Sequence, residues 1–328
     1  MSVAPDIAAI RAAAARLSGR ARRTPLLSSP FLDRIAGRRV LVKAECLQHT
    51  GSFKFRGAWA AVSALPDALR ARGVLAYSSG NHAQGVALAA QMHAIPAVIV
   101  MPACAPALKI ANTRALGAEV VLYDRTRESR EEIGARLAEE RGLTLIRPYD
   151  EPEVIAGQGS VGLEIAEQAE RAGVSEADVL VCCGGGGLTS GIALALEGAA
   201  PGLRPRPVEP EAFDDTAQSL RAGRIIGHGK PENGLCDAIL TPQPGALTFP
   251  VMARLCGPGL TATDDQVLRA MAAAFLRLKI VLEPGGAVAL AAALFSPDAV
   301  AGEAVIVVAS GGNADPATFA RALAHAQD

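Results

Sequence analysis

The sequence DVLVCCGGGGLTSGIALALEGA, residues 178–199, indicates both how this chain folds and what it binds. A short apolar run is followed by four glycines, Gly184 to Gly187, and then by residues typical of a helix that begins near Leu188. Glycines let backbone N–H groups curl around an anion, and a helix N-terminus adds a favourable dipole. The segment lacks the Lys-Ser/Thr of a Walker loop and the glycine spacing of a dinucleotide site. It therefore predicts a phosphate cradle at a strand-to-helix turn, with a flexible turn as the alternative.

Short apolar runs and helical segments alternate on both sides of this stretch. Strands are expected at residues 39–45, 74–77, 97–101, 119–123, 143–146, 178–183 and 303–310. Helices are expected at residues 55–65, 82–92, 107–117 and 128–142. This alternation predicts an α/β protein with mainly parallel twisted sheets, and the Val, Ile and Leu content of the strands is typical of sheets covered on both faces.

The composition excludes several classes of protein. The 328 residues carry a formal net charge of −1 with a pI near 6.5, so no global basic field would attract nucleic acid. No apolar run is long enough to span a membrane, and residues 1–23 lack the apolar core of a secretory signal. The 6 cysteines form no CxxC pair, which favours buried thiols in a reducing cytosol over a disulfide frame or a zinc site. A cytoplasmic protein without a nucleic-acid or membrane partner is expected.

One of the few lysines in the chain stands in an unusual setting. In GSFKFRGAWAA (51–61), Ser52 is a plausible helix N-cap and Lys54 follows in the first turn, flanked by aromatic residues. Apolar neighbours and a helix N-terminus both lower the pKa of an amine, and Schiff-base chemistry requires a neutral amine. A solvated surface lysine is the alternative.

Two polar loops follow expected strands. In YSSGNHAQGVALAAQM (77–92), hydroxyls, an amide and backbone N–H groups between a strand and a helix can bind a carboxylate. The polar side chains of this loop are Ser78, Ser79, Asn81 and His82. A capping turn explains the same loop equally well. In VIVVASGGNAD (305–315), a buried strand ends at Ser310, and two glycines allow close backbone approach.

In this order, the segments resemble the fold-type II pyridoxal 5′-phosphate (PLP) enzymes, and more narrowly the serine/threonine dehydratase and serine racemase family. The resemblance covers almost the whole chain. The matching motifs are SFKFRGA (52–58), SSGNHAQG (78–85), VIAGQG (154–159), CGGGGL (183–188), EPEAFDDTAQSL (209–220), LEPGGAVALAA (282–292) and SGGN (310–313). It implies the two-domain fold of tryptophan synthase β-like enzymes.

The resemblance also implies a role for individual residues. Lys54 would carry PLP as a Schiff base and shuttle the substrate α-proton, while Ser79 matches the second acid/base of the racemases. Asn81 would hydrogen-bond the 3′-oxygen of PLP, and Ser310 would face the pyridine nitrogen. Further cofactor contacts are expected from Phe53, Gly184, Gly185, Gly186, Gly187 and Leu188. The substrate carboxylate is expected to contact Ser78, Ser79, Asn81 and His82.

The segment EPEAFDDTAQSL is the position at which family members bind a divalent cation. Here the ligands would be Glu209, the carbonyl of Phe213 and Asp215. Hard oxygen ligands completed by water fit Mg²⁺ or Ca²⁺. An acid-rich helix N-terminus without metal is the alternative.

The expected domains are a large PLP-binding domain, residues 1–72 and 148–328, and a small domain, residues 73–147, that closes over the substrate. We expect PLP in the cleft between them, a side-chain pocket shaped in part by residues 234–249, and a homodimer by family resemblance.

The resemblance implies a threonine/serine ammonia-lyase, which converts L-threonine or L-serine to a 2-oxo acid and ammonia by α,β-elimination. A hydroxyl partner such as Ser310 leaves the ring nitrogen unprotonated, and the resulting weaker electron sink suits elimination. The alternatives are a serine racemase, or a hydroxyaspartate ammonia-lyase, which needs an extra cation or donor for the distal carboxylate. More distant alternatives are a β-replacing synthase of the cysteine synthase type and a non-catalytic protein that binds PLP or another ligand.

Overall fold

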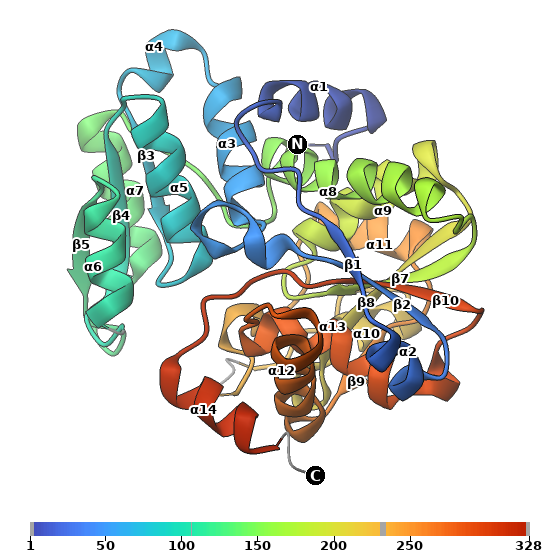
Figure 1. The fold of residues 1–328 in the computed structure, drawn as a ribbon. Helices are drawn as coiled ribbons and strands as arrows, with labels where there is room; N and C mark the ends of the chain where they lie inside the picture. Colours follow the sequence, from blue (N-terminus) through green and yellow to red (C-terminus); the bar gives the residue numbers. More distant parts are fainter. Residues whose placement is uncertain (1–2, 106, 230–233, 326–328) are drawn as a thin grey trace.

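Figure 1 shows the computed structural model, which describes residues 3–105, 107–229 and 234–325. Its strands form two sheets. The larger sheet has 6 strands in the order β1-β2-β10-β7-β8-β9, with β1 antiparallel to β2 and the other neighbours parallel. The smaller sheet has 4 parallel strands in the order β5-β4-β3-β6. The predicted α/β class with mainly parallel sheets is confirmed.

The larger sheet takes its strands from residues that precede and follow the segment of the smaller sheet. They are β1 (Leu26–Ser28), β2 (Arg39–Lys43), β7 (Ala177–Cys182), β8 (Leu203–Pro210), β9 (Leu260–Ala262) and β10 (Ala304–Val308). The helices outside the smaller sheet are α1 (Ile7–Leu17), α2 (Pro30–Ala36), α3 (Lys54–Ala64), α8 (Pro152–Arg171), α9 (Gly187–Ala199), α10 (Asp215–Ala222), α11 (Thr248–Leu255), α12 (Asp264–Leu278), α13 (Pro284–Phe295) and α14 (Pro316–Ala324). Single 3-10 turns are η1 (Glu45–Leu47), η2 (His49–Gly51), η3 (Glu211–Phe213), η4 (Asp237–Ile239) and η5 (Pro297–Ala299).

The smaller sheet is built from one continuous part of the chain, at the left in Figure 1. Its strands are β3 (Val74–Tyr77), β4 (Ala97–Pro102), β5 (Glu119–Tyr123) and β6 (Thr144–Leu145), accompanied by α4 (Asp67–Arg70), α5 (Asn81–Met92), α6 (Ala107–Ala115) and α7 (Arg130–Arg141). Val74 and Ala76 pack with residues of α5, whereas Leu75 between them packs with residues of α7. Alternate residues of β3 are therefore buried on opposite faces, as the apolar strands indicate. The exact domain boundaries remain a prediction.

Three strands of the larger sheet are missing from the expected set: β1, β8 and β9. Strand β8, LRPRPVEP, contains prolines that argue against a central strand. However, β9 pairs with only its last residues, Val208 to Pro210. The first part of β8 therefore has one open edge, where prolines are tolerated.

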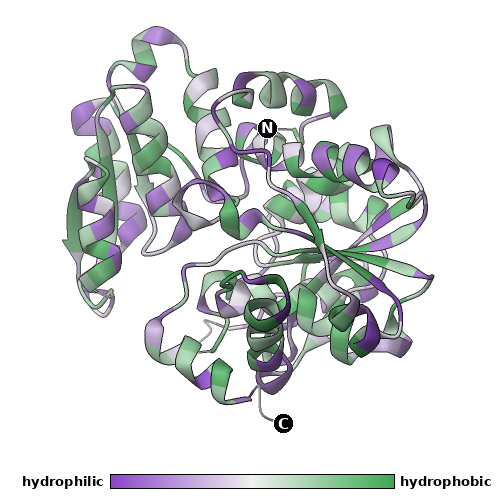
Figure 2. Ribbon diagram, in the orientation of Figure 1, coloured by the Kyte–Doolittle hydropathy of each residue, from purple (hydrophilic) through white to green (hydrophobic). Residues whose placement is uncertain are grey.

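The hydrophobic residues follow the expected distribution. Figure 2 shows them concentrated on the strands, while hydrophilic residues gather on the outer sides of the helices. Strands β4, β7 and β10 are buried along their whole length. Among the described residues, no helix is long and apolar enough to cross a membrane.

Candidate active site

The two sheets enclose a cavity of about 590 Å³ at the carboxyl ends of their parallel strands. In open α/β sheets, ligands bind at this edge. The cavity brings together all the residues predicted to hold the cofactor or the substrate carboxylate. They are Phe53, Lys54, Ser78, Ser79, Asn81, His82, Gly184, Gly185, Gly186, Gly187, Leu188 and Ser310. Residues 237–246 also line it, as expected for the segment 234–249.

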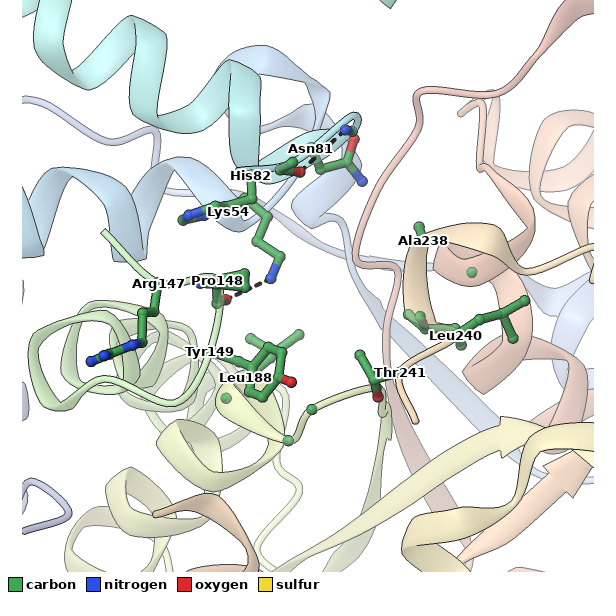
Figure 3. Close-up of a pocket in the computed structure, with 18 of the residues that line it drawn as sticks. Lys54, Asn81, His82, Arg147, Pro148, Tyr149, Leu188, Ala238, Leu240 and Thr241 are labelled. Atoms are coloured by element: carbon green, nitrogen blue, oxygen red, sulfur yellow. Dashed lines mark hydrogen bonds between the residues drawn. The ribbon is translucent and has the colours of Figure 1, made fainter. Parts of the chain in front are cut away.

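Lys54 is the first residue of α3, and its amine points into the cavity. Its Nζ donates a hydrogen bond of 2.7 Å to the carbonyl of Pro148, drawn as a dashed line in Figure 3. Loss of surrounding water lowers the pKa of this amine to about 8, against the opposing influence of Cys182 and Glu283. A fraction of Lys54 is therefore neutral near physiological pH, as nucleophilic amine chemistry requires.

Ser52 is not the N-cap of this helix, contrary to expectation. The helix begins one residue later, with Phe53 in the cap position. Ser52 has extended backbone angles and forms an isolated bridge with Gly311. Its buried hydroxyl has no partner among the described residues. The start of α3 is held by pairing with the loop after β10, and not by a serine cap.

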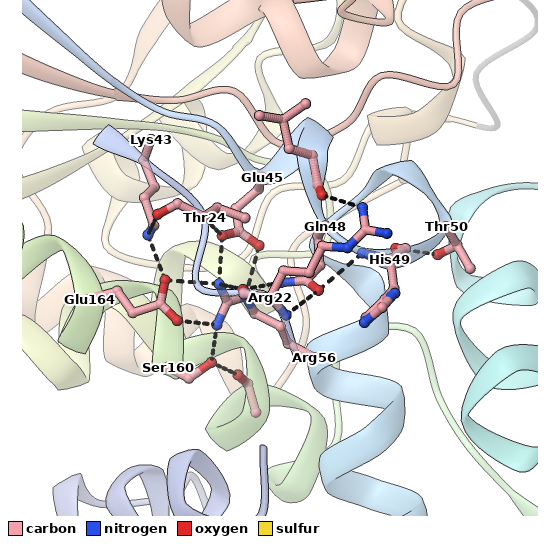
Figure 4. A network of polar contacts seen from close by, with 12 residues as sticks. Arg22, Thr24, Lys43, Glu45, Gln48, His49, Thr50, Arg56, Ser160 and Glu164 are labelled. Atoms are coloured by element: carbon pink, nitrogen blue, oxygen red, sulfur yellow. Dashed lines mark hydrogen bonds and ion pairs between the residues drawn. The ribbon is translucent and has the colours of Figure 1, made fainter. Parts of the chain in front are cut away.

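A buried ionic network fixes α3 two residues beyond Lys54 (Figure 4). The Arg56 guanidinium donates to both carboxylate oxygens of Glu45 at 2.8 Å and to those of Glu164 at 2.7 and 3.0 Å. Lys43 donates to the same Glu164 at 2.5 Å. Two cations are thus balanced by two carboxylates, an arrangement that compensates their desolvation.

The four glycines form the predicted turn between β7 and α9. Gly186 caps α9 with φ +88°, a conformation that strongly favours glycine. A Cβ at Gly185 would lie 2.3 Å from the ring of Tyr149, which packs on this loop. The first N–H groups of α9 have no partner within the helix, so the loop is a suitable phosphate site.

Gln158 of α8 provides an independent sign that this cradle takes a ligand. It lines the cavity and is fully buried. Its Oε1 would lie 2.8 Å from a Cβ added to Gly187, so the amide is close to the glycine loop. Neither its Oε1 nor its Nε2 has a hydrogen-bond partner in the described part of the chain. Buried amides are normally paired, so an amide of this kind beside an anion cradle fits a polar ligand such as the PLP phosphate.

The expected carboxylate loop leads into α5, whose N-terminus lies at the cavity. Its first backbone N–H groups are free to bind an anion. The His82 ring, however, hydrogen-bonds to the carbonyl of Ile146 at 2.9 Å, and burial lowers its pKa to about 3. The ring is neutral and its Nε2 is engaged, so we expect His82 to contact a carboxylate through its backbone N–H.

Ser310 follows β10 and is almost fully buried in the cavity wall. Its hydroxyl oxygen accepts a hydrogen bond from the Cys182 thiol at 3.0 Å. Because the oxygen already accepts, the hydroxyl hydrogen remains available to donate to a ring nitrogen. This geometry fits the expected partner of a pyridine ring.

The three predicted metal ligands do not line the cavity. Glu209 accepts hydrogen bonds from the backbone N–H groups of Thr216 and Ala217, at 2.9 and 2.8 Å, at the start of α10. Asp215 has a buried Oδ2 without a partner among the described residues. The described residues contain no cluster of three or more His, Cys, Asp or Glu side chains suited to a metal. The unpaired carboxylate oxygen fits a cation, and the site, including the Phe213 carbonyl, remains a prediction.

Several cavity residues escaped the sequence analysis. Glu283 is buried and accepts a hydrogen bond from Asn81 at 2.6 Å, and burial raises its pKa to about 7. Cationic side chains at the rim are Lys109, Arg125, Arg130 and Arg147. Glu283 lies in the quoted motif LEPGGAVALAA, but the rim cations belong to no motif, and only the fold brings them together.

Comparisons with known proteins show which family this chain resembles. A family model described as "pyridoxal-phosphate dependent enzyme" matches residues 17–311. An L-threo-3-hydroxyaspartate ammonia-lyase from Pseudomonas is 44% identical over 95% of this chain and 96% of its own length. A serine racemase from Schizosaccharomyces pombe is 39% identical over 98% of both chains. The crystal structure of a threonine deaminase from T.th. has a TM-score of 0.89 and 45% identity, covering 95% of this chain and 99% of that one.

Proposed function

The chain belongs to the family of pyridoxal-phosphate dependent enzymes, and from this we propose that it is an ammonia-lyase acting on a small β-hydroxy amino acid. The product would be a 2-oxo acid together with ammonia, formed by α,β-elimination. The observation that supports the chemistry is the Lys54 amine, which has a lowered pKa and faces the cavity. The same cavity is lined by the glycine loop suited to a phosphate and by Ser310, a hydroxyl partner for a ring nitrogen.

When bound, PLP withdraws electrons from the substrate α-carbon. The protein's part is to hold the cofactor, orient the substrate and move protons. Lys54 takes the α-proton, and the α5 N-terminus holds the substrate carboxylate with Ser78 and Ser79 nearby. Ser310 would donate a neutral hydrogen bond to the ring nitrogen, which keeps the ring a weaker electron sink and suits elimination, in which the β-hydroxyl is protonated and leaves as water.

We propose 3-hydroxyaspartate as the preferred substrate. This choice rests on rim cations on the smaller sheet's side of the cavity, which provide the extra donor that a distal carboxylate needs. Arg130 is the strongest candidate, because its guanidinium lies 5.2 Å from the Tyr77 ring centroid and its ion pair with Glu131 is solvent-exposed. Arg147 points away from Lys54 in Figure 3. Threonine and serine are the second candidates, supported by the likeness to the threonine deaminase.

Three further expectations remain proposals. Racemase activity would use Ser79 as the acid/base opposite Lys54. A divalent cation would be bound by Glu209, the Phe213 carbonyl and Asp215. The protein would act as a cytoplasmic homodimer.

The proposal is tested by measuring 2-oxo acid and the chirality of the remaining amino acid with both hydroxyaspartate diastereomers, L-threonine, L-serine and D-serine. Lys54→Ala should abolish turnover of all of them. A protein that binds PLP but releases no 2-oxo acid from any of these compounds would be a non-catalytic binding protein, and the proposal would fail.

The substrate choice has its own test. Removing a hydrogen bond to a charged group costs about 1.5–3 kcal/mol. Arg130→Ala should therefore lower kcat/KM for hydroxyaspartate about 10- to 100-fold and leave the value for threonine within about 3-fold. Arg136→Ala is the matched control, since Arg136 lies on the same helix and pairs with Glu140 in solvent. Equal losses of kcat/KM for both substrates would refute Arg130 as the residue that binds the distal carboxylate.

A further inference from the structure

The side chain of Asn81 is bonded at both ends across the two sheets. Asn81 is the first residue of α5, beside the smaller sheet. Its Oδ1 accepts a hydrogen bond from Asn313 Nδ2 at 2.7 Å, and its Nδ2 donates to Glu283 Oε1 at 2.6 Å. Both partners belong to the part of the chain that accompanies the larger sheet. The carboxamide therefore joins the two parts of the protein at the cavity.

Both partners are themselves held by backbone. Asn313 Nδ2 also donates to the carbonyl of Thr50 at 2.8 Å. The backbone N–H of Glu283 donates to the carbonyl of Gly311 at 3.1 Å, and a Cβ on Gly311 would lie 1.9 Å from Glu283 Oε1. The Asn313 side chain is thus bonded to backbone, and the Glu283 carboxyl lies directly against the backbone of Gly311.

These contacts also fix which way the carboxamide faces. If Asn81 were flipped, its NH₂ group would face the NH₂ of Asn313, and its oxygen would face the Glu283 carboxyl. Asn313 therefore selects one orientation, and Glu283 provides an oxygen acceptor whether it is ionised or protonated. In that orientation one of the two Nδ2 hydrogens remains for another partner. Asn81 also lines the cavity.

We propose that Glu283 and Asn313 are positioning residues that orient the Asn81 carboxamide, so that its remaining N–H is presented to the oxygen substituent of the cofactor ring. The inference rests on the proposed PLP site but not on the identity of the amino acid substrate. The same contacts hold the substrate loop against the larger sheet, so the site is complete only when the two sheets are joined in this way.

The test measures cofactor binding, so that it does not depend on catalysis. PLP is titrated into the apoprotein while its absorption band and dissociation constant are recorded, and the pH at which the bound band changes is determined. Asn313→Asp replaces the donor to Asn81 by an acceptor. It should weaken PLP binding about tenfold, the effect of one lost hydrogen bond, and shift the pH of the spectral change. Glu283→Gln, which keeps an oxygen acceptor, should lose less PLP affinity than Glu283→Ala.

A double-mutant cycle separates positioning from a general structural effect. If Asn313 acts through Asn81, then Asn313→Asp should raise the PLP dissociation constant by less than about a further twofold when Asn81 is already Ala. Asn112→Asp, an exposed change on α6, is the control and should bind PLP as the wild type does. If Asn313→Asp does not fold, Glu283→Ala is used in the same cycle. Additive losses, or wild-type affinity and spectrum in Asn313→Asp, would overturn the inference, even if the ammonia-lyase proposal holds.

Discussion

The Lys54 amine donates a 2.7 Å hydrogen bond to the carbonyl of Pro148. Pro148 lies where the chain returns from β6 of the smaller sheet to α8. The next residue, Tyr149, packs on Gly185 of the phosphate cradle. One short connection therefore binds the Lys54 amine and contacts the glycine loop.

This setting predicts the pH dependence of cofactor capture. Only a neutral amine attacks an aldehyde, and desolvation lowers the pKa of Lys54 to about 8. The neutral fraction of an amine rises with pH. Because the pKa of Lys54 is lowered, this fraction reaches its maximum at a lower pH than for an ordinary lysine. The rate at which apoprotein captures PLP should therefore rise up to about pH 8 and then level off. Stopped-flow absorbance measures it, and a rate still rising tenfold per pH unit from 9 to 10, on the order expected for a pKa near 10.4, would contradict the prediction.

Ser79→Ala should impair proton transfer on only one face of the substrate. Lys54 is the proposed base on the face from which the α-proton of an L-amino acid leaves, and Ser79 is the proposed acid/base on the opposite face. General acid–base catalysis contributes about 10²–10⁴-fold, so use of D-serine and racemisation should fall by at least about 100-fold. Elimination from the L-substrate should remain, and it serves as the internal control. Equal loss with both enantiomers would assign Ser79 to substrate binding instead.

Replacing Gln158 should change apoprotein stability and cofactor affinity in opposite directions. Both amide atoms of Gln158 are buried without partners among the described residues, a cost of about 1–3 kcal/mol for each unsatisfied group. Gln158→Leu removes this cost, so the melting temperature of the apoprotein should stay the same or rise. The increase in melting temperature on adding PLP should become smaller. Gln91→Leu, an exposed change on α5, is the control. A variant with an unchanged PLP response would show that Gln158 does not contact the ligand.

Arg56 carries a prediction about folding stability. Arg56→Met leaves the buried Glu45 carboxylate without its main partner, and breaking a buried ion pair costs about 3–5 kcal/mol. Urea unfolding of the apoprotein should show a loss of this size. Arg136→Met, which affects an exposed ion pair on α7, should change stability by less than about 0.5 kcal/mol. Similar losses of unfolding free energy in both variants would mean that the buried ion pairs stabilise the fold no more than the exposed pair does.

Local patterns indicated residues that the fold brings to one cavity, because a strand, a glycine run and a helix start determine where a backbone anion site can form. Lys54 was likewise marked by its neighbours in sequence. Strand β8 was not predictable in this way, since Pro205 and Pro207 are acceptable because β9 pairs only with the last residues of the strand.

The contacts of Glu283 and Arg56 also depend on the fold. Glu283 and Asn81 are 202 residues apart in sequence, and Arg56 and Glu164 are 108 apart. No local periodicity indicates that such residues meet. Ser52 shows the reverse case, in which a good local capping signal is overridden by pairing with Gly311.

The proposed cation site can be tested through protein stability. Glu209 and Asp215 are both largely buried, and repulsion between them adds to the effect of burial, raising the pKa of Glu209 to about 8. A divalent cation would neutralise the two carboxylates and bind the unpaired Asp215 oxygen. Mg²⁺ or Ca²⁺ at 100 times its dissociation constant should therefore stabilise the protein by about 2.7 kcal/mol, and EDTA should reverse the effect. Asp215→Asn should abolish the response, whereas Glu211→Gln, an exposed change in η3, should keep it. If Asp215→Asn keeps the full response, the cation binds elsewhere, because the carboxylate charge it would need at this position is gone.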